Sequence, residues 1–157
     1  TKVFVSFQWD IFRFIDQQEP ASVKVREHTK VIDIFRPALD LVGVTTYPTE
    51  HYATPADLPQ DYYSVLRNHL QPNDEVIVME AGWPSEGKGT PGEQVEFVRR
   101  LPGLLKDLPV RVLAWALLHD VGLKEFDVNL NTVGLLTLDG QKKPAFEAFR
   151  DIGQKHA

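Results

Sequence analysis

The chain has 157 residues, of which 43% are hydrophobic and 25% are charged, a composition typical of one globular domain with a single core. Its formal net charge of −5 argues against a surface that binds nucleic-acid phosphates, and the lack of cysteine excludes disulfides and thiolate zinc sites. No apolar run reaches the roughly 18 residues of a membrane-spanning helix, so neither nucleic acid nor membrane is expected as a partner.

Four short apolar runs predict β-strands, because each is rich in β-branched or aromatic residues and is bounded by Pro, Gly, Asp or Asn. In chain order these are residues 3–9, 41–47, 76–80 and 111–117. Amphipathic stretches between and after them predict helices at 23–39, 60–70, 93–105 and 144–152. Pro102 is expected to kink or split the third helix, and Pro144 suits the first turn of the last.

Repeated strand–helix units predict an α/β fold with a parallel sheet, and the strand faces favour a closed barrel over an open sheet. Polar side chains gather on one face near the carboxyl ends of the strands, which suits a barrel mouth. The inward face of the second and third strands is predicted to carry Gly43, Thr45, Tyr47, Val76, Val78 and Glu80. The outward face is predicted to carry Val42, Val44, Ile77 and Met79. In the first strand Ser6 and Gln8 share one face, opposite Val3, Val5 and Phe7.

The number of units predicts half of a barrel. A complete (β/α)8 TIM barrel takes about 250 residues, whereas four units occupy residues 1–157 here. The longest connections, at 48–59 and 119–143, follow the second and fourth strands. Both are expected to rise from the catalytic face, where long loops usually carry function.

A carboxylate closes the third strand. Glu80 follows four apolar residues and precedes Gly82, Trp83 and Pro84. A Glu at an arbitrary strand end is usually a solvated surface residue. This one, however, lies at the mouth of the expected barrel, beside a Trp83 ring that offers a flat face for stacking on a sugar.

The Glu-x-Gly-Trp-Pro-Ser motif at 80–85 resembles the nucleophile motif of clan A glycoside hydrolases, most closely the endo-β-1,3-glucanase type. Residues 41–48 resemble strand six, particularly of endo-β-1,4-galactanases, and 112–115 resemble strand eight. The segment 134–146 resembles the tail of such enzymes.

This resemblance implies a retaining hydrolase of a β-linked oligo- or polysaccharide, with strands five to eight in this chain. It makes Glu80 the nucleophile, Tyr47 its hydrogen-bond donor and Trp115 the floor of the sugar subsite. It implies neither cofactor nor metal, and a secreted or extracytoplasmic location.

The sequence lacks a convincing candidate for the second catalytic carboxyl group. Retaining hydrolysis needs two carboxyl groups about 5–5.5 Å apart. The family's acid/base Glu, usually preceded by Asn, belongs to strand four, and no Asn-Glu pair occurs here. Glu50 and Asp10 are conceivable stand-ins, although each is more typical of a solvated loop carboxylate. The fragment alone is therefore expected to be inactive.

Other side chains have two interpretations each. Gln8 and Trp9 end the first strand and are candidates for the cleft, while Trp9 is equally suited to the core. His119 is a candidate for a hydrogen bond to a sugar hydroxyl, or a solvated loop residue. Tyr62 and Tyr63 are expected on a helix surface or in packing.

Two alternative sites lack required residues. The segment 82–88 has the spacing of a phosphate loop, but Gly89 stands where Ser or Thr is required. The pairs at 119–120 and 50–51 lack the helical spacing and the third ligand of a metal site. No motif supports a different α/β enzyme, so the alternative function is a non-catalytic carbohydrate-binding or structural half-barrel.

A half-barrel also needs a partner. Two unpaired strand edges and an exposed concave face would be costly in water. The expected partner is a missing N-terminal half-barrel or a second copy of this chain, with a symmetric homodimer favoured. The concave face is expected to expose Phe4, Val76, Val78, Leu113 and Trp115.

Overall fold

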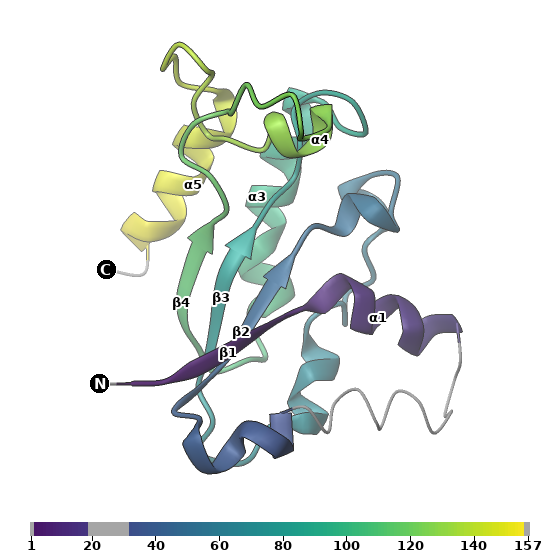
Figure 1. Ribbon diagram of the computed structural model, residues 1–157, viewed down its shortest axis with the longest axis vertical. Helices are drawn as coiled ribbons and strands as arrows, with labels where there is room; N and C mark the ends of the chain where they lie inside the picture. The colour runs from purple at the N-terminus through teal and green to yellow at the C-terminus, as the bar shows by residue number, and fades with distance from the viewer. Residues whose placement is uncertain (1, 19–31, 156–157) are drawn as a thin grey trace.

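The structure is a computed structural model that describes residues 2–18 and 32–155, which form a four-stranded parallel sheet with helices. The strands lie in chain order: β1 (Phe4–Gln8), β2 (Leu41–Thr46), β3 (Val76–Ala81) and β4 (Val110–Trp115). The main helices are α1 (Trp9–Gln18), α3 (Pro91–Leu105) and α5 (Pro144–Lys155). In Figure 1, β2, β3 and β4 point toward α4 (Val128–Asn131) and the long loop between β4 and α5, whereas β1 runs directly into α1. The predicted α/β class and parallel sheet are confirmed.

Two predicted helices differ from the structure. Only the end of 23–39 lies within the described residues, as a helical turn at 32–35 followed by the 3-10 helix η1 (Arg36–Ala38). The helix predicted at 60–70 is instead the 3-10 helix η4 (Ser64–His69). It follows the 3-10 turns η2 (Pro48–Glu50) and η3 (Pro55–Asp57).

The tighter turn suits the burial of this segment. Tyr62, Tyr63 and Leu66 are all fully buried. Three residues per turn align Tyr63 with Leu66 on one side of the 3-10 helix. Conversely, residues 9–18, for which the sequence predicted no helix, form α1.

One face of the sheet packs against α3 and forms the core. The helix begins at the Thr90 cap, whose hydroxyl accepts a hydrogen bond from the Glu93 amide at 3.2 Å, and it continues through Pro102. The buried cluster of strand and helix side chains includes Val42, Val44, Val76, Val78, Phe97, Leu101 and Leu104.

A bulge in β3 corrects the predicted inward set. Val44 pairs with Val78, but the next residue, Thr45, pairs with Glu80, so Met79 is skipped. The extra residue reverses the alternation of side chains. Val76 and Val78 therefore belong to the core cluster instead of the face that carries Glu80, contrary to the prediction.

The other side of the sheet, here called the open face, is polar toward the strand ends and apolar further down. The hydroxyls of Ser6 and Thr45 lie 2.9 Å apart on it. Phe4 is 38% exposed and Val112 49% exposed. Leu113 and Trp115, predicted to be exposed here, are half-buried and pack against the core. The open face thus exposes Phe4 as predicted, but with Val112 in place of the other four residues.

Candidate active site

Glu80 is the second-last residue of β3, and its side chain is exposed at the carboxyl ends of the strands. Its carboxylate Oε2 accepts a hydrogen bond of 2.8 Å from the Tyr47 hydroxyl. Tyr47 follows β2 directly, so the contact joins the ends of two neighbouring strands. Of the three strand-end residues predicted to converge, Tyr47, Glu80 and Trp115, the first two are in contact.

The position of the Tyr47 ring depends on a glycine. A Cβ atom at Gly82 would lie 2.6 Å from Tyr47 Cε1, a distance that real side chains do not adopt. The Gly82 amide also donates to the Thr46 carbonyl at 3.0 Å. Gly82 thus lets the ring lie against the backbone that follows β3, within reach of Glu80.

The Tyr47 phenol remains protonated, so it can act as a hydrogen-bond donor. Its burial, then its hydrogen bond to Glu80 and the negative charges of Glu80 and Asp10, raise the pKa of Tyr47 far above its usual range. The phenol therefore stays protonated at neutral pH and donates to the carboxylate.

A buried carboxylate supports the pair from behind. Asp10, in the first turn of α1, is 1% exposed. Its Oδ1 accepts from the Tyr47 amide at 2.8 Å, and its Oδ2 accepts from Gln8 Nε2 at 2.9 Å. The sequence suggested Asp10 only as a solvated carboxylate or a stand-in acid, and the structure places it inside.

A tyrosine cluster packs behind the same strand end. Tyr63 donates to the Thr46 hydroxyl at 3.2 Å, and the Tyr62 hydroxyl lies 3.5 Å from it. Burial is the main cause that raises the pKa of both phenols, and the charge of Asp10 adds to it. Both rings belong to the core rather than to a helix surface.

Two predicted sugar platforms are corrected. Trp83 is fully buried, with its ring 5.3 Å from that of Phe97, so it has no face free for a sugar. Trp115 packs between Phe97 and Phe149 on the helix-covered side and donates to the Val133 carbonyl at 2.6 Å. In both cases the aromatic rings of α3 and α5 provide a better-packed environment than the open face.

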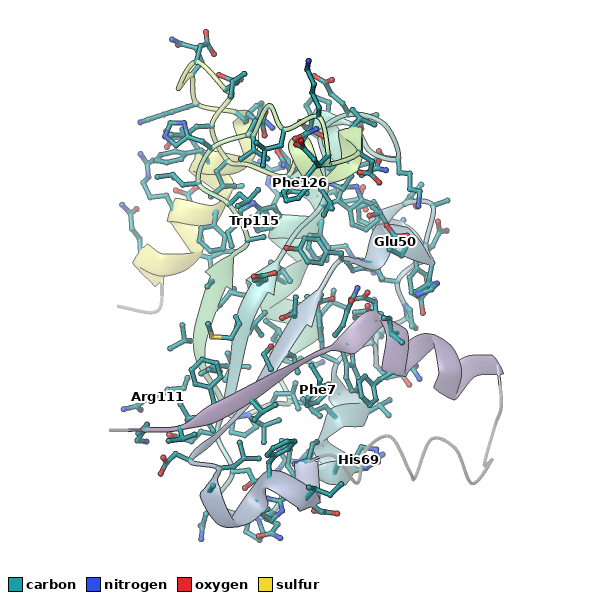
Figure 2. The ribbon with its side chains drawn as sticks, viewed as in Figure 1. Phe7, Glu50, His69, Arg111, Trp115 and Phe126 are labelled. Atoms are coloured by element: carbon teal, nitrogen blue, oxygen red, sulfur yellow. The ribbon has the colours of Figure 1, made fainter. Side chains whose placement is uncertain are left out.

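The remaining candidates are divided between the core and the rim. Trp9 is a core residue whose indole donates to the Tyr62 carbonyl at 2.9 Å. Glu50 is exposed and forms an ion pair of 3.2 Å with Lys88. His119 is exposed on the loop after β4, where its backbone pairs with Leu136. Figure 2 shows Glu50 on the loop after β2 and Trp115 near α5.

A second buried network anchors the loops above the strands. The Lys143 ammonium donates to Asp120 Oδ1 at 2.6 Å, to Ser85 Oγ at 2.8 Å and to the Thr132 carbonyl at 3.0 Å. It ties the loop after β3 to the long loop before α5. The sequence gave no indication of this network.

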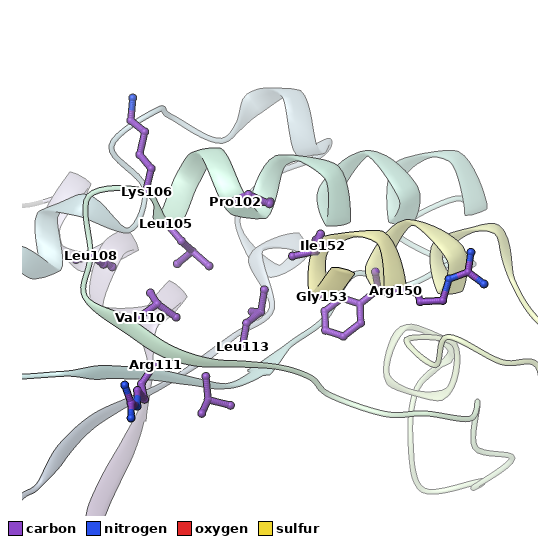
Figure 3. Close-up of a pocket in the computed structure, with 12 residues that line it drawn as sticks. Pro102, Leu105, Lys106, Leu108, Val110, Arg111, Leu113, Arg150, Ile152 and Gly153 are labelled. Atoms are coloured by element: carbon purple, nitrogen blue, oxygen red, sulfur yellow. The ribbon is translucent and has the colours of Figure 1, made fainter. Parts of the chain in front are cut away.

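A pocket of about 790 Å³ lies elsewhere, between the carboxyl end of α3, the start of β4 and α5 (Figure 3). Leu105, Val110, Leu113 and Ile152 are among its lining residues. It is at the opposite end of the strands from Glu80, so it is not part of this site.

Within 2–18 and 32–155, no three His, Asp or Glu side chains gather in a way that could hold a metal ion. In the same part of the chain, no helix is long and apolar enough to cross a membrane.

Comparison with known proteins identifies the fold. No protein-family model and no curated protein matches the chain. Native xylanase 10B from Thermotoga maritima matches with a TM-score of 0.57 at 12% identity, over 94% of this chain and 52% of that one. A β-glucuronidase from an uncultured Clostridium sp. matches with a TM-score of 0.54 at 19% identity, over 87% of this chain and 30% of that one.

The chain therefore spans about half or less of the structures that it resembles. Both are (β/α)8 barrels of glycoside hydrolases, and at these identities the likeness concerns the fold. The predicted half-barrel is confirmed.

Proposed function

We propose that this chain supplies the nucleophile half of a retaining β-glycan hydrolase, with Glu80 as the nucleophile. The contact between Tyr47 and Glu80 carries the proposal. An attacking carboxylate must be accessible to the substrate and held in a fixed orientation. Glu80 is exposed, and its Oε2 is held at 2.8 Å by a phenol that stays protonated.

In the proposed reaction Glu80 forms a bond to the anomeric carbon while the glycosidic C–O bond breaks. The leaving oxygen takes a proton from a second carboxylic acid, which later removes a proton from the water that displaces Glu80. The second acid is proposed to lie outside this chain, because Asp10 is buried and Glu50 is paired with Lys88.

The sugar contacts are proposed at the rim. Gln8 is half-buried beside Asp10, and His119 is exposed on the loop after β4. Both have donors suited to sugar hydroxyls. The names of the two similar structures, a xylanase and a β-glucuronidase, support the reaction class but not a particular sugar.

A second half-barrel is proposed as the structural partner. β1 and β4 each have one neighbour in the four-stranded sheet, so each leaves an edge unpaired. The apolar pocket between β4, α3 and α5 opens beside one of these edges. Either the rest of a longer chain or a second copy can complete the barrel. Light scattering on residues 1–157 tests the second copy, and we expect self-association of the fragment at micromolar concentration.

Covalent labelling tests the nucleophile. In the full-length protein, 2-deoxy-2-fluoro-β-glycosyl fluorides of glucose, galactose and xylose should trap a glycosyl group on Glu80, located by peptide mass spectrometry. Glu80→Gln should remain unlabelled, whereas Glu86→Gln, at an exposed position on the following loop, should be labelled normally. A label on another carboxylate would remove Glu80 from this role. Neither label nor turnover with any sugar would favour a non-catalytic half-barrel.

A further inference from the structure

Tyr47 is held by three contacts, and the contact of its backbone amide has no part in the proposed reaction. Its hydroxyl contacts Glu80 and its ring lies against Gly82. Its amide donates to Asp10 Oδ1 at 2.8 Å. Asp10 itself is 1% exposed, so it cannot touch a sugar.

A buried carboxylate is costly unless hydrogen bonds and nearby dipoles stabilise it. Asp10 has the amide of Tyr47, the side-chain amide of Gln8 and a place in the first turn of α1, where the helix dipole favours negative charge. Its two oxygens thus join the end of β1 to the residue that follows β2. The Asp10 carboxylate therefore holds the backbone in place and is shielded from solvent.

From this geometry we infer that Asp10 is a positioning residue for the nucleophile, acting through Tyr47. Without the carboxylate, the Tyr47 amide loses its acceptor and the backbone after β2 is free to shift. The phenol then moves relative to Glu80, which loses the donor that orients it. The inference rests on the proposed function, and it adds a residue that does not contact the substrate.

Three variants of the full-length protein test it. Asp10→Ala removes both acceptors, while Asp10→Asn keeps an oxygen for the Tyr47 amide and lets Gln8 rotate its amide to pair with the new NH2 group. Asp57→Ala is the matched control. Its carboxylate also accepts from a backbone amide, that of Thr54 at 2.9 Å, but within the 3-10 turn η3 and not at a strand end.

We expect Asp10→Ala to lower kcat about a hundredfold on dinitrophenyl β-glycosides, with KM within about twofold, because a displaced catalytic group costs about that much. Asp10→Asn should recover most of the loss, and Asp57→Ala should match the parent. A folded Asp10→Ala protein with unchanged kcat would overturn the inference, as would a loss of the same size in Asp10→Asn.

Amide hydrogen exchange of Tyr47, measured by NMR, gives a readout that needs no activity. Exchange should accelerate at Tyr47 in Asp10→Ala and stay slow in Asp10→Asn and Asp57→Ala. If the parent hydrolyses none of the glycosides, the proposed function fails. The exchange data still decide whether Asp10 fixes Tyr47, and unchanged exchange in Asp10→Ala would refute that.

Discussion

Two polar networks lie at the carboxyl ends of the strands, and each contains a charged side chain removed from water. The first runs from Asp10 through Tyr47 to Glu80. The second joins Lys143 to Asp120 and Ser85. In the second, ammonium and carboxylate neutralise each other at 2.6 Å, and the remaining donors end on protein oxygens.

The first network has no such closure, because it leads from a buried carboxylate to an exposed one. Its hydrogen bonds orient a group that still faces solvent. A closed network fixes loops, whereas an open one holds a reactive group ready for a ligand. The comparison predicts that damage to the first network lowers activity and damage to the second lowers stability.

The largest effect is expected at the open end. Glu80→Gln keeps the shape of the side chain and removes the carboxylate that is proposed to attack the sugar, so kcat of the full-length protein should fall by about 10⁴-fold or more. The free energy of unfolding should change little, since the side chain is exposed. Glu86→Gln is the control and should keep its kcat. Near-normal turnover by Glu80→Gln would show that the first network serves another purpose.

Damage to the second network, around Lys143, should lower the free energy of unfolding. Lys143→Met leaves Asp120, of which only 14% is exposed, without its cation, and we expect a loss of about 3 kcal/mol in the free energy of unfolding. Urea unfolding followed by tryptophan fluorescence measures it, because Trp83 and Trp115 both pack in the interior.

Two further variants sharpen this measurement. Lys142→Met removes an exposed ion pair with Glu147 and should cost less than about 1 kcal/mol. The double variant Lys143→Met/Asp120→Leu removes both buried charges and should recover more than half of the loss. Equal losses in Lys142→Met and Lys143→Met would contradict the assignment of a buried anchor.

The sequence predicted the first network better than the second, for physical reasons. Strand ends in a parallel sheet meet at one edge, so a tyrosine after one strand and a carboxylate after the next were expected to approach. Lys143 and Asp120, in contrast, are 23 positions apart in an irregular loop whose path no periodicity encodes.

The errors have local causes as well. The β3 bulge at Met79 changes which side chains face the helices, and a strict period of two cannot foresee it. Trp83 and Trp115 were expected beside a sugar because aromatic rings suit both uses. Their burial against Phe97 depends on how α3 packs, which the local sequence does not specify.

The middle of the first network should show an intermediate effect. Tyr47→Phe keeps the ring on Gly82 and deletes only the hydroxyl that donates to Glu80. A hydrogen bond to a charged group is worth about 1.5–3 kcal/mol, so we expect kcat to fall by about 10- to 100-fold. Steady-state kinetics on the same glycosides measure it. A change in KM alone would mean that Tyr47 binds sugar instead of orienting the nucleophile.

The smallest expected effect is on the pH dependence of stability. It concerns the first network alone, because buried tyrosines pack behind that network and not behind the second. Burial is the main cause that raises the pKa of Tyr63, and the charge of Asp10 adds to it. The folded protein therefore favours the protonated phenol. Its contribution to stability is fully present below about pH 10 and is lost as pH rises from there toward the raised pKa.

Tyr63→Phe removes this titration. Between pH 9 and 11 the variant should lose about 1 kcal/mol less of its free energy of unfolding than the parent. The hydrogen bond to Thr46 is lost at both pH values and cancels in the difference. Thr46→Val is the control, since it deletes the same bond but keeps the phenol, so its alkaline loss should match that of the parent. An alkaline loss in Tyr63→Phe as large as in Thr46→Val would mean that Tyr63 does not titrate with unfolding.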